Sequence, residues 1–175
     1  RDLLAQFEHD PEGALATLHT LLQSTKDPIR LNNRLFALAE LSFLYAEQSK
    51  KHPAAQSYQC WVLKGKSCPP PVHNEQEEEK DRAYFLAAAV YAYALLFPED
   101  QPGVLLNSAD PRLRLAYDLY NRGLAEGLAS RDGEEVVLAS GRHPLPFGVL
   151  EIESKATEFS WGGYPLEHFL PSANF

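Results

Sequence analysis

Apolar residues recur every three or four positions over most of residues 1–130, which is the spacing of one face of an α-helix. The alanine-rich centre of one such stretch, at 87–89, has little side-chain bulk, so we expect a neighbouring helix to approach it closely. The pattern predicts a mainly α fold built of antiparallel helical hairpins. The expected helices cover residues 11–24, 28–50, 78–97 and 111–129, with a short helix over 3–7 before them.

Aspartate–proline pairs mark the expected starts of three of these helices. Aspartate is a strong N-cap because its carboxylate accepts hydrogen bonds from the free N–H groups of the first turn. Proline is tolerated in the next position, where no intrahelical donor is needed. The pairs are Asp10-Pro11, Asp27-Pro28 and Asp110-Pro111.

The helical pattern is interrupted over residues 51–76, which include the run Pro69-Pro70-Pro71. We expect an irregular insertion here, within which residues 54–63 are compatible with an additional helix. Both cysteines, Cys60 and Cys68, fall in this stretch. They are either two free thiols or a local disulfide, and a disulfide would require an oxidising compartment. A zinc site is not expected, because the chain has no CxxC pair.

The last third of the chain changes character. Partial alternation predicts strands at 134–138 and 147–152, and the segment His143-Pro144-Leu145-Pro146 between them has turn chemistry. We therefore expect a helical domain over 1–130 with its insertion, followed over 131–175 by a β-hairpin and an aromatic tail. Because that tail has no core of its own, we expect it to pack on the helices or on a downstream domain. Its aromatic residues are Phe159, Trp161, Tyr164, Phe169 and Phe175.

Charge and hydropathy exclude two classes of partner. The chain has 16 Lys and Arg against 24 Asp and Glu, and its net charge of -8 argues against binding to nucleic acid or to an anionic membrane surface. Its longest apolar run, Phe85 to Phe97, has 13 residues. That is shorter than the roughly 18 residues that predict a transmembrane helix. We expect neither a nucleic-acid partner nor a transmembrane segment.

The motifs of common enzyme classes are missing from the sequence. It contains no G-x-S-x-G elbow, no HExxH zinc motif and no glycine-rich phosphate loop. Ser140 and His143 lie only three positions apart, and residues so close along the chain rarely form a catalytic triad. We therefore expect no catalytic residue, no metal ligand and no cofactor in this chain.

The most distinctive group of polar residues lies on the helix expected at 111–129. Asp118, Asn121 and Arg122 share one face of it, with Asp118 and Arg122 four positions apart. They either form a surface ion pair beside buried tyrosines or contact a partner. Together with Trp161 and Tyr164 of the aromatic tail, they are our candidates for contacts to another domain or protein.

Three segments resemble the helical amino-terminal region of large bacterial α/β-hydrolase-like proteins, which are exported esterases or lipases: 35–43, 83–93 and 115–125. The segment 145–148 is similar to the stretch that joins that region to the hydrolase core. The resemblance implies a non-catalytic helical domain that packs on, or covers, a downstream catalytic domain, with all catalytic residues beyond Phe175. It favours an exported or periplasmic location. Since the chain begins with Arg1 and has no methionine, we expect a piece of a longer protein.

A second resemblance concerns the helices expected at 28–50 and 78–97. They are similar to tetratricopeptide-type pairs, with Leu41 and Tyr45 on one helix, Ala88 and Ala92 on the next, and Pro98 at its end. No 34-residue period repeats along the chain. This resemblance implies the alternative function, a freestanding module that binds a protein or peptide in a concave face.

Overall fold

The computed structural model describes residues 3–64, 75–98, 106–107, 109–130, 136–154, 160–161 and 164–165, with backbone only at 51–64 and in the last two pairs. The fold is mainly helical with a small antiparallel hairpin, which confirms the expected class. Its helices are α1 (Leu3–His9), α2 (Pro11–Gln23), α3 (Pro28–Lys64), α4 (Glu75–Leu96) and α5 (Pro111–Gly127). Its strands are β1 (Gly141–Leu145), β2 (Gly148–Ile152), β3 (Ser160–Trp161) and β4 (Tyr164–Pro165).

The aspartate–proline pairs begin helices as predicted. The carboxylate of Asp10 accepts a hydrogen bond from the backbone N–H of Gly13 at 3.0 Å, at the start of α2. Asp27 and Asp110 accept in the same way from the second or third residue of α3 and α5, each at 2.9 Å. These starts are encoded locally, because cap and proline are adjacent in sequence.

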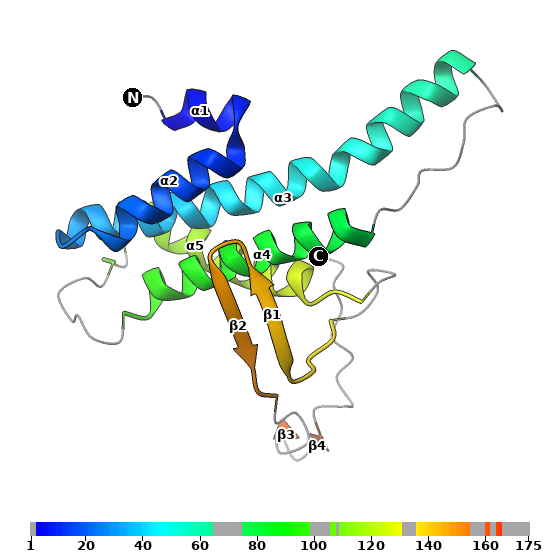
Figure 1. Cartoon of the computed structure of the whole chain (residues 1–175). Coiled ribbons are helices and arrows are strands. Elements are labelled where there is room, and N and C mark those ends of the chain that lie inside the picture. Colours follow the sequence, from blue (N-terminus) through cyan, green and yellow to red (C-terminus); the bar gives the residue numbers. More distant parts are fainter. Residues whose placement is uncertain are drawn as a thin grey trace.

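Helix α4 is central to the fold. It packs against both α3 and α5, while α2 lies along α3 and the β1–β2 hairpin crosses over α4 (Figure 1). One core joins these helices, and its apolar side chains come mostly from α3 and α4. The largest fully buried ones include Leu15, Leu38, Leu86 and Leu95.

Small residues let α4 and α5 approach closely, as the alanine-rich sequence predicts. Ala87, Ala88 and Ala89 are all buried. On the facing helix, a Cβ added to Gly123 would lie 2.7 Å from the backbone oxygen of Phe85. The backbones of the two helices are therefore too close at this crossing for any larger side chain on α5.

Helix α3 is longer than expected. It was predicted to end near Lys50, but its backbone stays helical to Lys64, so the irregular insertion does not begin at residue 51. Residues 51–76 were expected to be irregular because the helical pattern is interrupted there and the run Pro69-Pro70-Pro71 lies within them. Residues 54–63 are themselves compatible with helix, and they extend α3 instead of forming a separate element.

The first strand and the turn of the hairpin have different bounds from those predicted. His143, Pro144 and Leu145 lie in β1 instead of forming the turn, and the turn is Pro146-Phe147. Val136 makes only an isolated bridge to Ala129, and residues 137–138 are not in a strand.

Pro144 is tolerated in β1 for a geometric reason. Leu145 and Gly148 close a two-residue loop, and Pro144 faces Val149 in the next pair. Hydrogen-bonded and non-hydrogen-bonded pairs alternate in an antiparallel ladder, so Pro144 falls where no inward N–H is needed.

Other predicted features fall partly or wholly outside the described side chains. The backbones of Trp161 and Tyr164 pair across β3 and β4, but their side chains lie outside the description, as do the side chain of Cys60 and all of Cys68. Within the described helices, none is both long enough and apolar enough to cross a membrane.

Candidate functional site

Exposed aromatic side chains gather where the end of α4 meets α5. The ring of Tyr93 lies 5.0 Å from that of Phe97 and 5.9 Å from that of Tyr120, measured between centroids. Tyr117 lies one turn before Tyr120 on α5. Tyr93, Phe97 and Tyr117 are 42%, 44% and 43% exposed. We call Tyr93, Phe97, Tyr117 and Tyr120 the aromatic patch.

The aromatic patch corrects the predicted inner face of α5. Tyr117 is one of the tyrosines of this helix that were expected to be buried, but it is exposed, and Leu119 is buried. The close contact of Gly123 with α4 explains the difference, because it turns the face of residues 116, 119 and 123 toward the core. A leucine–tyrosine pattern alone does not distinguish these two faces.

The polar residues predicted on α5 separate into two roles. Arg122 forms an ion pair with Glu47 of α3, with Nη2 2.8 Å from Oε1, and its guanidinium lies 4.5 Å from the ring centre of Phe43. The predicted pair of Arg122 with Asp118 is therefore not formed. Asp118 and Asn121 are exposed on α5 and border the aromatic patch. Arg122 thus joins helices, while the other two remain accessible.

A ring stack holds the hairpin on the helices. Phe147, in the β1–β2 turn, stacks on the imidazole of His19 of α2 at 4.5 Å with an interplanar angle of 8°. Nδ1 of His19 is 2.8 Å from the hydroxyl of Tyr91 on α4. Burial raises the pKa of Tyr91 above its ordinary value, so its hydroxyl stays protonated and can donate to the imidazole. The turn is therefore fixed to two helices at once.

Ser140 and His143 are not arranged as a nucleophile and its base. The Ser140 hydroxyl accepts the backbone N–H of Ser154 at 2.8 Å and donates to the Ser154 carbonyl at 3.4 Å. Both interactions close the open end of the hairpin. Nε2 of His143 is enclosed and has no hydrogen-bond partner among the described residues. The serine oxygen is held by backbone groups rather than by an imidazole.

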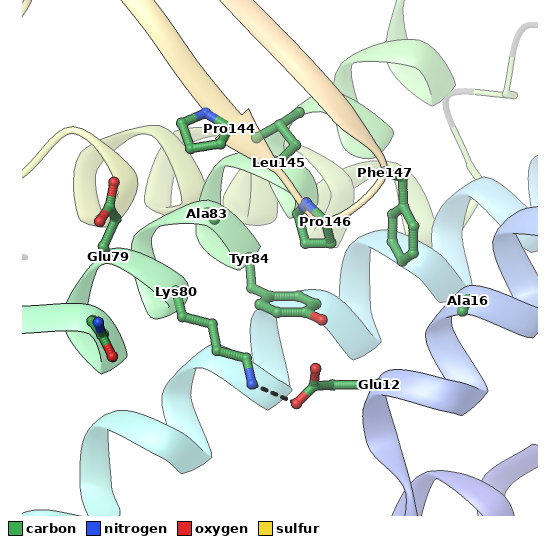
Figure 2. Close-up of a pocket in the computed structure, with 11 residues that line it drawn as sticks. Glu12, Ala16, Glu79, Lys80, Ala83, Tyr84, Pro144, Leu145, Pro146 and Phe147 are labelled. Atoms are coloured by element: carbon green, nitrogen blue, oxygen red, sulfur yellow. Dashed lines mark hydrogen bonds and ion pairs between the residues drawn. The ribbon is translucent and has the colours of Figure 1, made fainter.

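An open pocket of about 480 Å³ lies between α2, the first half of α4 and the β1–β2 turn (Figure 2). Its polar side chains come from the helices, and its apolar wall comes largely from the turn. The lining residues include Glu12, Glu79, Lys80, Tyr84, Pro146 and Phe147. Sequence reasoning missed this pocket, because its residues come from separate elements and share no local motif.

A charged cluster lies at one side of this pocket. Oε1 of Glu12 accepts hydrogen bonds from Lys80 at 2.5 Å and from the Tyr45 hydroxyl at 2.8 Å. The Lys80 hydrogen bond, followed by that of Tyr45, lowers the pKa of the Glu12 carboxyl below its ordinary value. The same pairing raises the pKa of Lys80. Both groups therefore stay charged near neutral pH.

Of two further ion pairs, one joins two helices and the other lies at the start of α5. Lys50 of α3 pairs with Glu126 of α5 at 2.7 Å. Arg112 chelates the capping carboxylate of Asp110, and this contact lowers the Asp110 pKa to about 2. In the part of the chain that the structure describes, no three His, Cys, Asp or Glu side chains converge as metal ligands.

Comparisons of the chain with protein families, with curated proteins and with solved structures give no match. A functional interpretation therefore depends on the geometry above and on the sequence resemblances.

Proposed function

We propose that this chain is a non-catalytic helical domain of a bacterial serine-hydrolase-like protein, and that it packs on the catalytic domain. The observation that carries the proposal is the aromatic patch. Tyr93, Phe97 and Tyr117 are large, partly apolar side chains that are exposed where the end of α4 meets α5. Aromatic residues are enriched in the energetically important centres of protein interfaces, and charged residues are depleted there.

The polar border of the patch fits the same function. Asp118 and Asn121 are exposed beside it, whereas the nearby Arg122 is already paired with Glu47. An apolar centre with a polar rim is the usual composition of a protein–protein interface. The rim would therefore supply hydrogen bonds to a partner without burying an unpaired arginine.

The resemblance of 35–43, 83–93 and 115–125 to hydrolase-associated helical regions supports a catalytic domain as the partner. Two of these segments cover the middle of α4 and most of α5, the helices that carry the patch. The engagement of Ser140 with the Ser154 backbone supports a non-catalytic role for the hairpin.

The test is the parent protein itself. We expect its reading frame to continue past codon 175 into an α/β domain with a G-x-S-x-G elbow. We expect that protein to hydrolyse p-nitrophenyl esters, and residues 1–175 alone to show no turnover. A frame without such a domain would overturn the proposal, as would turnover by the 175-residue chain that Ser140→Ala abolishes.

The aromatic patch also fits the alternative function, a freestanding tetratricopeptide-like interaction module. That function predicts that the 175-residue chain captures a separate protein through Tyr93 and Tyr117. The two functions are distinguished by whether the partner is encoded in the same reading frame. The resemblance to the hydrolase-associated region covers more of the chain, and we favour it for that reason.

A further inference from the structure

The pocket beside the β1–β2 turn is separate from the aromatic patch and has no part in the proposed function. Its volume of about 480 Å³ lies within the range of small-molecule sites, roughly 300–1,000 Å³. It combines an apolar wall with a small number of fixed polar groups, which is the usual composition of a ligand site. The chemistry of these polar groups determines which ligand the pocket can recognise.

Glu12 offers one oxygen to the pocket. Its Oε1 accepts hydrogen bonds from Lys80 and from the Tyr45 hydroxyl, and these two hydrogen bonds hold the carboxylate in place. Among the described residues, Oε2 has no hydrogen-bond partner, and Figure 2 shows this second oxygen directed away from Lys80, toward the side of the pocket formed by Pro146 and Phe147. Since its pKa is lowered, the carboxylate is ionised near neutral pH. The pocket therefore has a fixed, negatively charged acceptor with one free oxygen.

The opposite side of the pocket is apolar. Pro144, Leu145, Pro146 and Phe147 form it, and Tyr84 of α4 lies between them and Glu12 (Figure 2). Phe147 is held by its stack on His19. A flat aromatic or short alkyl group can pack on these side chains while it stays within reach of Glu12.

The charge of the pocket selects among such ligands. Lys80 balances the negative charge of Glu12, and Glu79 adds a second carboxylate to the lining. The lining residues thus carry a net negative charge, and the whole chain carries -8. A carboxylate ligand would meet repulsion here, whereas a protonated amine would be attracted and could donate directly to Glu12.

We propose that this pocket binds a small organic amine. Its ammonium group donates a hydrogen bond to Oε2 of Glu12, and its aromatic or alkyl body packs against Tyr84, Pro146 and Phe147. Lys80 and Tyr45 act as positioning residues, because they hold Glu12 through its other oxygen.

The test compares three probes of one shape: 2-phenylethylamine, 2-phenylethanol and phenylacetate. We expect the amine to bind with a Kd of about 1 mM, the alcohol about fivefold more weakly, and the acid not measurably, by NMR titration of the chain. Amide shifts should appear at Ala16, Tyr84 and Phe147. No amine binding up to about 10 mM would overturn the proposal, as would equal binding of amine and alcohol or shifts confined to other residues.

Variants test whether the negative charge of Glu12 is what binds the amine. Glu12→Gln keeps the shape of the side chain and removes its charge, so we expect it to weaken amine binding about fivefold and to leave alcohol binding unchanged. Glu40→Gln, on α3 outside the pocket lining, is the matched control and should bind the amine as the unmodified chain does. Unchanged amine binding by Glu12→Gln would contradict the proposal. If this variant does not fold, the shift mapping on the unmodified chain decides.

Discussion

Phe147 is the residue through which the hairpin is held on the helices. Its ring stacks on His19, and its centroid lies 6.4 Å from that of Tyr91, so a single turn residue contacts both α2 and α4. It also lines the pocket. Residue-scale contacts of this kind decide where the hairpin sits, because its two short strands cannot form a stable unit alone.

We predict that Phe147→Ala loosens the hairpin without unfolding the helices. The side chain is half-buried, so we expect a loss of about 1–2 kcal/mol in the free energy of unfolding. Backbone amides of β1 and β2 should exchange with solvent faster, and this is measured by hydrogen exchange. Val149→Ala, at an exposed position of the same hairpin, is the control and should change stability by less than about 0.5 kcal/mol. Equal exchange rates in both variants would contradict the anchoring role.

Asp81 is a buried carboxyl in the helical core, 9% exposed. Burial, as the largest cause, raises its pKa above the ordinary 3.8, although a hydrogen bond from Ser49 opposes the shift. The folded chain therefore takes up a proton here at a higher pH than the unfolded chain does. This group destabilises the fold above its folded pKa, and stability is regained as the pH falls through that value toward 3.8.

We accordingly predict that Asp81→Asn stabilises the chain at pH 7 and that the gain shrinks toward pH 4. Asparagine keeps the shape and can still accept from Ser49, but it carries no charge to bury. Chemical unfolding at both pH values measures the difference. Asp118→Asn, at an exposed position on α5, should have no comparable effect. A destabilised Asp81→Asn at pH 7 would show that the charge of Asp81 supports the fold.

At the scale of elements, α4 and α5 cross with their backbones in close contact. Ala89 and the backbone of Phe85 face Gly123, and Leu86 faces Gly127 four residues later. Small residues spaced by four positions lie on the same face of a helix, so the two glycines form one continuous groove for α4. Close approach of the backbones replaces side-chain interdigitation here.

Gly123→Ala should therefore destabilise the chain, although alanine is the better helix former. Its Cβ would lie 2.7 Å from the Phe85 carbonyl oxygen, and that backbone atom cannot move aside cheaply. We expect a net loss of about 1–3 kcal/mol in unfolding free energy, measured by denaturant titration. The exposed site Asn121→Ala on the same helix is the control. A stabilised Gly123→Ala would mean that α4 and α5 are not in close contact.

Most helix boundaries were predictable because their signals are local. Asp10, Asp27 and Asp110 each cap a helix that begins at the next residue, so two adjacent residues are enough to predict each helix start. The end of α3 and the bounds of the hairpin's first strand were not predictable in the same way. The interrupted pattern from residue 51 suggested the end of a helix, and Pro144 was expected in a turn. Whether a proline ends an element depends on whether its missing N–H would have faced a backbone partner.

At the scale of the whole molecule, the polar groups serve mainly to join elements. Glu12 and Lys80 link α2 to α4, and Glu47 and Arg122 link α3 to α5. The pocket and the aromatic patch are assembled from residues that are far apart in sequence, which is why pattern reasoning located neither. Pattern reasoning did select Asp118 and Asn121, which border the patch, because polar residues at helical spacing indicate the exposed face of a helix.

The central proposal is that a longer parent protein contains a catalytic domain and that this domain buries the aromatic patch. Hydroxyl-radical footprinting with mass spectrometry reads side-chain exposure directly, and it can compare the 175-residue chain with the full-length protein. We predict that Tyr93, Phe97 and Tyr117 are oxidised several-fold more slowly in the full-length protein, while Leu4, exposed on α1, is oxidised equally in both. Equal oxidation of the three aromatic side chains in both proteins would contradict the account.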